Sequence, residues 1–240
     1  MRGSTGDDGL NNAGSASAGA AFSRAREHAA FSRAREQQAE VQAVVFDVGH
    51  VLYDWDPRFL YEKLIADADR LDWFLGHVVT RQWHFQHDAG RPFVETAAEL
   101  AALFPAEAGL IAQYGPRWLE TIPGPVPGSL ELVRELAAAQ VPLYAITNFA
   151  HEFWAMFRPT APIFDLFRDI IVSGTEKLVK PDPAIYQLAQ ARFGLGGGAA
   201  IFIDDNAANV RAAQDSGWLA HRFEGAAGAR AALLAAGIRL

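Results

Sequence analysis

Five short apolar runs alternate with helix-like segments from Val41 onward, and this alternation admits few folds. The expected strands are residues 42–47, 142–147, 169–173, 200–204 and 219–223. The expected core helices are residues 129–139, 150–157, 183–193 and 207–216. Pro181, Pro183 and Gly217 stand where helices begin or end. Strands separated by helices pair in parallel through right-handed crossovers, so the sequence predicts an α/β fold with a doubly wound, Rossmann-like parallel sheet.

One stretch breaks the alternation. Residues 57–123 contain no convincing strand, and their apolar spacing predicts helices over 57–67, 70–80, 92–103 and 107–121. We therefore expect a core of residues 41–56 and 124–240, with a small helical cap, residues 57–123, inserted after the first strand. A cap in that place would lie over the carboxyl ends of the strands, where it can exclude water and select substrate.

The first 40 residues differ from the rest. They are rich in Gly, Ala and Ser, and residues 21–29 are nearly repeated in residues 30–36. This composition predicts a disordered arm that becomes a short helix near residues 20–40. A docking arm through Phe22 and Phe31 is one alternative, and a mis-assigned start codon or an expression leftover is another.

Composition limits the partners and the compartment. The net charge of −7 argues against nucleic acid or an anionic membrane as the main partner. The absence of cysteine excludes disulfides, thiolate catalysis and cysteine zinc sites. No apolar stretch is long enough to span a bilayer, and no apolar signal core follows the N-terminal charges. We expect a cytoplasmic enzyme, as a monomer or homodimer.

Polar residues close the apolar runs or lie beside them. A carboxylate such as Asp47, which ends the run Val44–Phe46, is costly to remove from water unless it is paired, hydrogen-bonded or metal-bound. Further along stand Thr147, Asn148, Lys180, Asp204 and Asp205. Taken singly, each is compatible with a turn, a helix cap or a solvated loop. Ligands of such sheets bind at the carboxyl ends of the strands, so together these residues predict one active site there.

The residue types point to phosphoryl transfer. Adjacent carboxylates such as Asp204 and Asp205 repel each other unless a cation separates them, which favours a hard metal such as Mg²⁺. Asp47 supplies a nucleophile, Thr147 a hydroxyl and Lys180 a positive charge. Phosphoryl transfer needs a positioned nucleophile together with donors and cations that neutralise the phosphoryl oxygens.

Four motifs in this order resemble those of the haloacid dehalogenase-like (HAD) superfamily of hydrolases, in its subclass with a helical cap. The resemblance covers residues 43–223, and its most specific pieces are Phe46–Leu52, Ile146–Asn148, Lys180–Tyr186 and Phe202–Asn209. It implies a magnesium-dependent phosphatase that hydrolyses a small phosphorylated metabolite.

The resemblance also implies a role for each matched residue. Asp47 would attack phosphorus and become an aspartyl-phosphate. Thr147 and the Asn148 backbone would hold the phosphoryl oxygens, while Lys180 neutralises the phosphate and the nucleophile. Magnesium would be held by Asp47, Asp205, the Gly49 carbonyl and, more remotely, Asp204, with Asn209 bracing this loop.

The chain departs from the family pattern at Gly49. Family phosphatases usually carry a second aspartate there, which protonates the leaving group and then activates water. The sub-branch that resembles α-glucose-1-phosphate phosphatases also has glycine, usually followed by Asn, whereas this chain has His50. Three explanations compete: the leaving group needs little protonation, a cap residue (His84, His87 or Asp88) supplies the proton, or His50 acts itself. A polar patch on a cap helix and an outward-pointing His50 are the competing structural interpretations.

Two other functions remain open. The dehalogenases of the superfamily attack carbon without magnesium and also tend to lack the second aspartate. The diacid Asp204-Asp205 favours the phosphatase, because these charges would repel a carboxylate substrate. A regulatory protein that binds a phosphorylated metabolite but turns it over slowly is the alternative outside enzymes.

Overall fold

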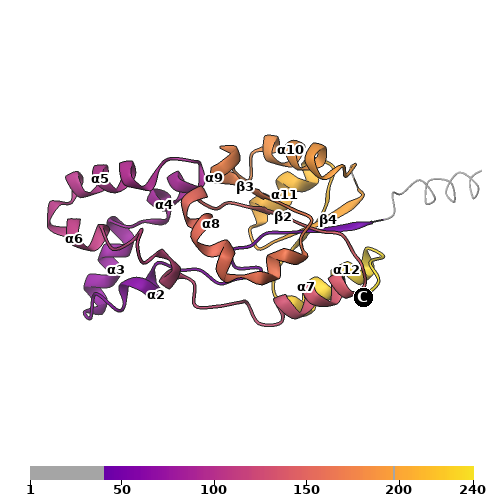
Figure 1. Ribbon diagram of the computed structural model, residues 1–240, viewed down its shortest axis with the longest axis horizontal. Helices are drawn as coiled ribbons and strands as arrows, with labels where there is room; N and C mark the ends of the chain where they lie inside the picture. The colour runs from indigo at the N-terminus through magenta and orange to yellow at the C-terminus, as the bar shows by residue number, and fades with distance from the viewer. Residues whose placement is uncertain (1–40, 197) are drawn as a thin grey trace, which may run out of the picture. The chain divides into compact units, whose positions relative to one another are not determined.

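A five-stranded parallel sheet lies at the centre of the computed structural model, which describes residues 41–196 and 198–240 (Figure 1). Its strands are β1 (Ala43–Phe46), β2 (Leu143–Thr147), β3 (Asp169–Val172), β4 (Ala200–Asp204) and β5 (Leu219–Arg222). They pair in the order β3-β2-β1-β4-β5, and all the neighbours are parallel. Each strand falls within a predicted one, which confirms the predicted sheet. The predicted N-terminal arm, residues 1–40, lies outside the described residues.

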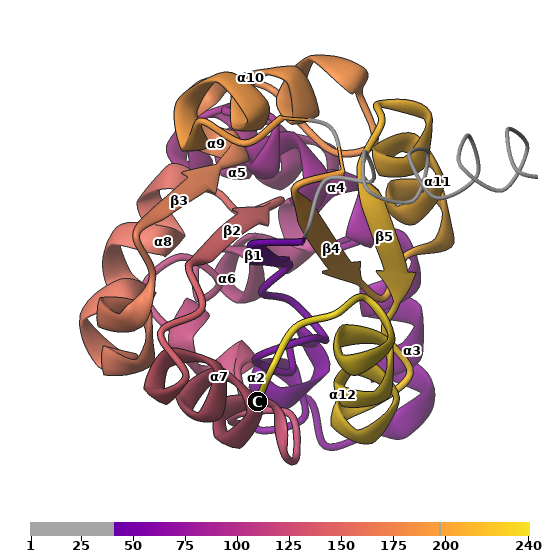
Figure 2. The same cartoon turned by 90° about the vertical axis from the view of Figure 1, so that its right-hand side faces the viewer.

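The sheet is covered by helices on both faces. Successive side chains of a strand point to opposite faces, so Val44 and Phe46 of β1 join one apolar cluster and Val45 joins the other. The Val45 face is packed by two helices, α10 (Pro183–Phe193) and α11 (Ala207–Asp215). The opposite face is packed by α7 (Ser129–Ala138) and α12 (Ala226–Ala235) (Figure 2). The doubly wound architecture is therefore confirmed.

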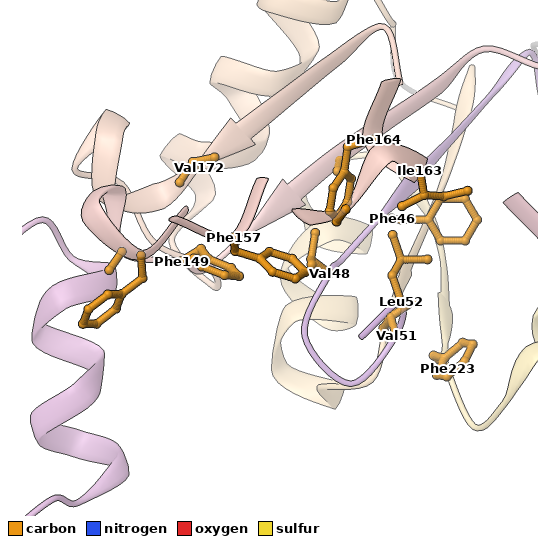
Figure 3. Packing of buried hydrophobic residues seen from close by; sticks show 14 of the residues in the cluster. Phe46, Val48, Val51, Leu52, Phe149, Phe157, Ile163, Phe164, Val172 and Phe223 are labelled. Atoms are coloured by element: carbon orange, nitrogen blue, oxygen red, sulfur yellow. The ribbon is translucent and has the colours of Figure 1, made fainter. Parts of the chain in front are cut away.

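The turn after β1 is anchored by apolar side chains. Val51 and Leu52 are fully buried, and the Leu52 N–H donates to the Val48 carbonyl at 2.9 Å. Figure 3 shows Val48 beside Phe157, the last residue of α8 (His151–Phe157). This packing holds the residues between Phe46 and Leu52 in one conformation, which matters because they contain the predicted nucleophile.

Helices and turns form the segment between β1 and β2, as predicted. Apart from α7, which packs against the sheet, they gather beyond the carboxyl ends of the strands, at the left of Figure 1. The helices are α2 (Arg58–Tyr61), α3 (Ala68–His77), α4 (Arg81–Asp88), α5 (Phe93–Leu103) and α6 (Ala108–Ile111). Among the described residues, no helix has the length and apolar character needed to cross a membrane.

The extents of three predicted cap helices were wrong. The helix predicted over 57–67 is only α2, and that predicted over 107–121 is split into α6 and a 3₁₀ turn, Trp118–Thr121. The helix predicted over 70–80 is α3, and α4 follows it as a separate helix. Side-chain caps set these boundaries: Asp67 accepts from the Arg70 N–H at 2.7 Å, and Thr80 accepts from the Trp83 N–H at 3.0 Å.

Candidate active site

Asp47 lies where β1 ends, in the middle of the sheet. Its N–H continues the pairing with β4 by donating to the Ile203 carbonyl at 2.8 Å. Its carboxylate accepts from the Val48 N–H at 2.6 Å and lies 2.8 Å from the Lys180 Nζ. Burial raises the pKa of Asp47 to about 7, with Lys180 opposing the rise and Asp204 adding to it. The predicted nucleophile is thus a buried carboxyl with a cation in direct contact.

Lys180 joins two carboxylates. Its Nζ lies 2.8 Å from Asp47 and 2.7 Å from Asp204, and the side chain is 1% exposed. Burial acts to lower its pKa, but Asp204 and Asp47 outweigh burial and hold the pKa above the usual range. Asn148 fixes the backbone of this lysine: it accepts from the Lys180 N–H at 2.8 Å and donates to the Lys180 carbonyl at 2.9 Å. The Asn148 side chain therefore positions Lys180, a contact that the sequence did not reveal.

Asp204 is held by donors on every side. Besides Lys180, it accepts from the Asn206 N–H at 2.8 Å, and the Asn209 Nδ2 lies 3.1 Å from both of its oxygens. Tyr186 in turn donates to the Asn209 carbonyl at 2.9 Å. Asn209 thus braces this loop, in line with its predicted role. Asp204 is fully buried, and its contact with the Lys180 Nζ helps to orient that side chain.

The three aspartates form a cluster suited to a divalent cation. One carboxylate oxygen from each of Asp47, Asp204 and Asp205 lies within 4.8 Å of the others. Lys180 pairs with two of these carboxylates, Asp47 and Asp204. Burial and the Asp204 charge also raise the pKa of Asp205, which is half-buried beside the pocket. A hard cation with oxygen ligands fits this excess of negative charge.

Thr147 ends β2 next to this cluster. The residue is 1% exposed, and its hydroxyl has no hydrogen-bond partner among residues 41–196 and 198–240. A buried polar group is normally paired, and an unpaired one costs about 1–3 kcal/mol. A hydroxyl left free beside a cation and a nucleophile is suited to an oxyanion ligand.

A pocket of about 250 Å³ opens above these residues. Its polar end is formed by Asp47, Lys180, Asp205 and backbone around Gly49. Its apolar wall comes from both core and cap: Tyr53, Trp55, Trp118, Ile122, Phe149 and Phe157. The pocket is lined by most of the sequence-predicted site residues and adds an aromatic wall to them, whereas Thr147 and Asp204 lie buried behind it and do not line it.

His50 also lines the pocket, with a positive φ of 55°. Its Nδ1 lies 2.9 Å from the Asp54 carboxylate, and the side chain is 36% exposed. His50 therefore stands at the rim, paired with Asp54, rather than pointing wholly away from the site.

Of the three cap candidates, two line the pocket. His84 and Asp88 do so, whereas His87 turns away and contacts the Thr96 hydroxyl at 2.5 Å. Burial lowers the pKa of His84 to about 3, with His87 contributing, so the imidazole is neutral near pH 7. The 3.5 Å approach of its Nε2 to Asp88 is therefore not an ion pair.

One residue was missed by the sequence analysis. Ser173 directly follows β3; its hydroxyl donates to the Asp88 carbonyl at 2.7 Å and accepts from the Phe149 N–H at 2.9 Å. It thereby joins the end of α4 to the core. Its place at the carboxyl end of β3 was the signal that could have revealed it, because Asp47, Thr147 and Asp204 lie at the same ends of their strands.

A model for haloacid dehalogenase-like hydrolases matches residues 18–217 of the sequence. The chain belongs to this family of hydrolases. A curated relative, the sesquiterpene phosphatase astK of Aspergillus oryzae, is 26% identical over an alignment of 188 residues. The match covers 73% of this chain and 86% of that one.

Two solved structures share the fold. A HAD family enzyme from Bacteroides thetaiotaomicron, bt-2542, in complex with magnesium and inorganic phosphate, is 18% identical with a TM-score of 0.63, over 77% of this chain and 95% of that one. The L-2-haloacid dehalogenase from Xanthobacter autotrophicus, with chloropropionic acid covalently bound, is 20% identical with a TM-score of 0.56, over 83% and 85%. At these identities the likeness concerns the fold, and the chemistry must be argued from the residues.

Proposed function

We propose that this hydrolase is a magnesium-dependent phosphatase that cleaves a small phosphate monoester through an aspartyl-phosphate on Asp47. The observation that carries the proposal is the cluster of Asp47, Asp204 and Asp205 around a single Lys180. A phosphate dianion approaching Asp47 needs more positive charge than one ammonium group supplies, and a divalent cation provides it.

Each residue of the site then has its own role in the reaction. Asp47 attacks phosphorus in line with the leaving oxygen, and Lys180 holds the nucleophile and the transferring oxygens together. The Thr147 hydroxyl and the Asn148 N–H donate to the phosphoryl oxygens, and His50 contacts the substrate at the rim. Asp47, Asp205 and the Gly49 carbonyl would hold Mg²⁺, with Asp204 behind them; the ion supplies charge neutralisation. Its use is consistent with the magnesium and phosphate bound by the bt-2542 enzyme.

The leaving group faces the aromatic wall. The rings of Trp55, Trp118 and Phe149 offer apolar surface, so an alcohol with an apolar body suits the pocket. The named activity of the astK relative, a sesquiterpene phosphatase, supports this choice. A sugar phosphate is the competing substrate, because Gly49 is shared with the sub-branch that resembles α-glucose-1-phosphate phosphatases.

The test measures hydrolysis of p-nitrophenyl phosphate, then of a panel of terpenyl, alkyl and sugar phosphates, with Mg²⁺ or EDTA. We expect turnover that requires Mg²⁺ and is abolished in Asp47→Asn. The matched control is Asp72→Asn, which removes an exposed cap carboxylate paired with Arg58 and should leave the rate unchanged. Magnesium-independent chloride release from 2-chloropropionate, without phosphatase activity, would instead establish a dehalogenase.

A further inference from the structure

The active site lacks a proton donor at Gly49, although there is space for one. A Cβ placed on Gly49 meets no atom within 4 Å in the described part of the chain, and the residue has no positive φ. Glycine is therefore not required there by crowding or by backbone conformation. A phosphatase that releases an alkoxide still needs a proton for the leaving oxygen, and such help is worth about 10²–10⁴ in rate.

His84 and His50 line the pocket, but both are poorly suited to donate a proton to the leaving oxygen. His84 is neutral because burial lowers its pKa to about 3, and its Nδ1 lies 2.7 Å from the Tyr114 hydroxyl. A neutral imidazole is a weak acid. His50 stands at the exposed rim with its Nδ1 against Asp54.

Asp88, the last residue of α4, differs from both. It is 7% exposed and lines the same pocket as Asp47 and Lys180. Its Oδ1 has no hydrogen-bond partner within the described ranges, and His84 Nε2 lies 3.5 Å away. Asp88 is thus a buried carboxyl that lines the pocket and has an oxygen without a protein donor.

The surroundings of Asp88 favour its protonated form. Burial raises its pKa to about 8 and the Asp47 charge adds to the rise, whereas the Ala150 N–H and Lys180 oppose it. The other titratable groups that face it are neutral near pH 7: His84, for the reason above, and Tyr114, whose pKa burial raises well above its usual value. Asp88 therefore carries a proton near pH 7.

Asp88 is also fixed relative to the core. The Ser173 hydroxyl donates to the Asp88 carbonyl at 2.7 Å and accepts from the Phe149 N–H at 2.9 Å. The loop that carries Phe149 follows Thr147 and Asn148, the expected phosphate-binding residues. The backbone that carries the Asp88 carboxyl is thus tied, through Ser173, to the segment that would hold the phosphate.

We propose that Asp88, supplied by the cap, is the general acid and base that replaces the missing side chain at position 49; this rests on the proposed phosphatase function. In the first step an Asp47 oxygen bonds to phosphorus, the bond from phosphorus to the leaving oxygen breaks, and that oxygen takes the Asp88 proton. In the second step the Asp88 carboxylate takes a proton from water as the water oxygen bonds to phosphorus and the aspartyl-phosphate bond breaks. Phosphate leaves, and Asp88 is again protonated.

The test compares Asp88→Asn with the wild type on two substrates. Asparagine keeps the size and neutrality of the protonated carboxyl but gives no proton. An alkyl phosphate needs the proton, so its turnover should fall about 10²–10⁴-fold. p-Nitrophenyl phosphate has a leaving group that is stable as an anion, so its first turnover should be unchanged, seen as a rapid burst of p-nitrophenolate. Steady-state turnover of this substrate should fall, because hydrolysis of the aspartyl-phosphate lacks its base.

A second variant tests whether a carboxyl at position 49 can take over the role of Asp88. Adding Gly49→Asp to Asp88→Asn places a carboxyl in the open space at position 49, and alkyl phosphate turnover should recover at least tenfold. Glu107→Gln is the matched control: this buried cap carboxyl pairs with Arg70 outside the pocket, and its loss should not change the ratio of alkyl to aryl rates.

The outcomes separate the two levels of the argument. A wild type that hydrolyses no phosphate ester overturns the proposed function itself. A wild type that hydrolyses both substrates, with Asp88→Asn either unchanged or slowed equally in the first turnover of both, overturns the role of Asp88 and leaves the phosphatase intact.

Discussion

Gly174 offers a sharp test of how the cap end of the core is packed. It is buried just after Ser173, in α9 (Ser173–Glu176), and its N–H donates to the Phe149 carbonyl at 3.0 Å. A Cβ at this position would lie 2.6 Å from the His151 N, 2.8 Å from the Phe149 O and 3.0 Å from the Ala150 Cα. All three are backbone atoms, so no side chain can rotate away, and the two segments must separate.

Overpacking of this kind usually costs about 1–3 kcal/mol. For a chain of this size, Gly174→Ala should therefore lower the Tm by roughly 2–12 °C, since 1 kcal/mol corresponds to about 2–4 °C. The matched control is Gly76→Ala in α3, where an added Cβ meets no described atom within 4 Å. That substitution should raise the free energy of unfolding by about 0.4–1 kcal/mol, because alanine restricts the unfolded chain.

Urea titration followed by tryptophan fluorescence measures both changes. Equal stability of Gly174→Ala and the wild type, or equal losses in the two variants, would refute the close approach of α9 to the loop after β2. The displacement of α9 should also shift Ser173, so the folded variant should lose more activity on alkyl than on aryl phosphates.

Three further predictions follow from the site. Lys180→Met should lower the free energy of unfolding by about 3–5 kcal/mol in denaturant titrations, because two buried carboxylates lose their cation; an unchanged midpoint would contradict the pairing with Asp47 and Asp204. Tyr186→Phe removes the donor to the Asn209 carbonyl and should cost about 0.5–1.5 kcal/mol in the same measurement, with a wild-type value arguing against this brace. The kcat/KM for alkyl phosphates should fall as the pH rises through about 8, since Asp88 then loses its proton. A rate that keeps rising to pH 9, or the same fall in Asp88→Asn, would count against this assignment.

The three central strands, β1, β2 and β4, were predictable because they are buried on both faces. Such strands appear as continuous apolar runs, as in Val44–Phe46 and Ile201–Ile203, and each expected strand was found. The cap helices were harder to predict. Their lengths depend on single caps such as Asp67 and Thr80, and on a break near Gly115 and Pro116 that periodicity does not detect.

The site, too, could be predicted only in part. The gathering of Asp47 and Asp204 follows from their positions at the ends of neighbouring strands, which meet at one edge of a parallel sheet. Lys180 lies beyond α9, in the turn before α10, and reaches the two carboxylates from there. The bond between Ser173 and the Asp88 carbonyl joins residues 85 positions apart, and the burial that keeps His84 neutral depends on packing of the cap. Neither leaves a local pattern in the sequence.

The Ser173 hydroxyl has a consequence for how such an enzyme can diversify. It hydrogen-bonds the last residue of α4 to the core. The rest of the cap is joined to the core by other elements. Substitutions at Trp118 or Ile122, which line the pocket but lie outside α4, can reshape the space above the leaving group without moving the carboxyl at the end of α4. Substrate preference and proton transfer are thereby assigned to separate parts of one small insertion, so new substrates can be acquired while the chemical step is retained.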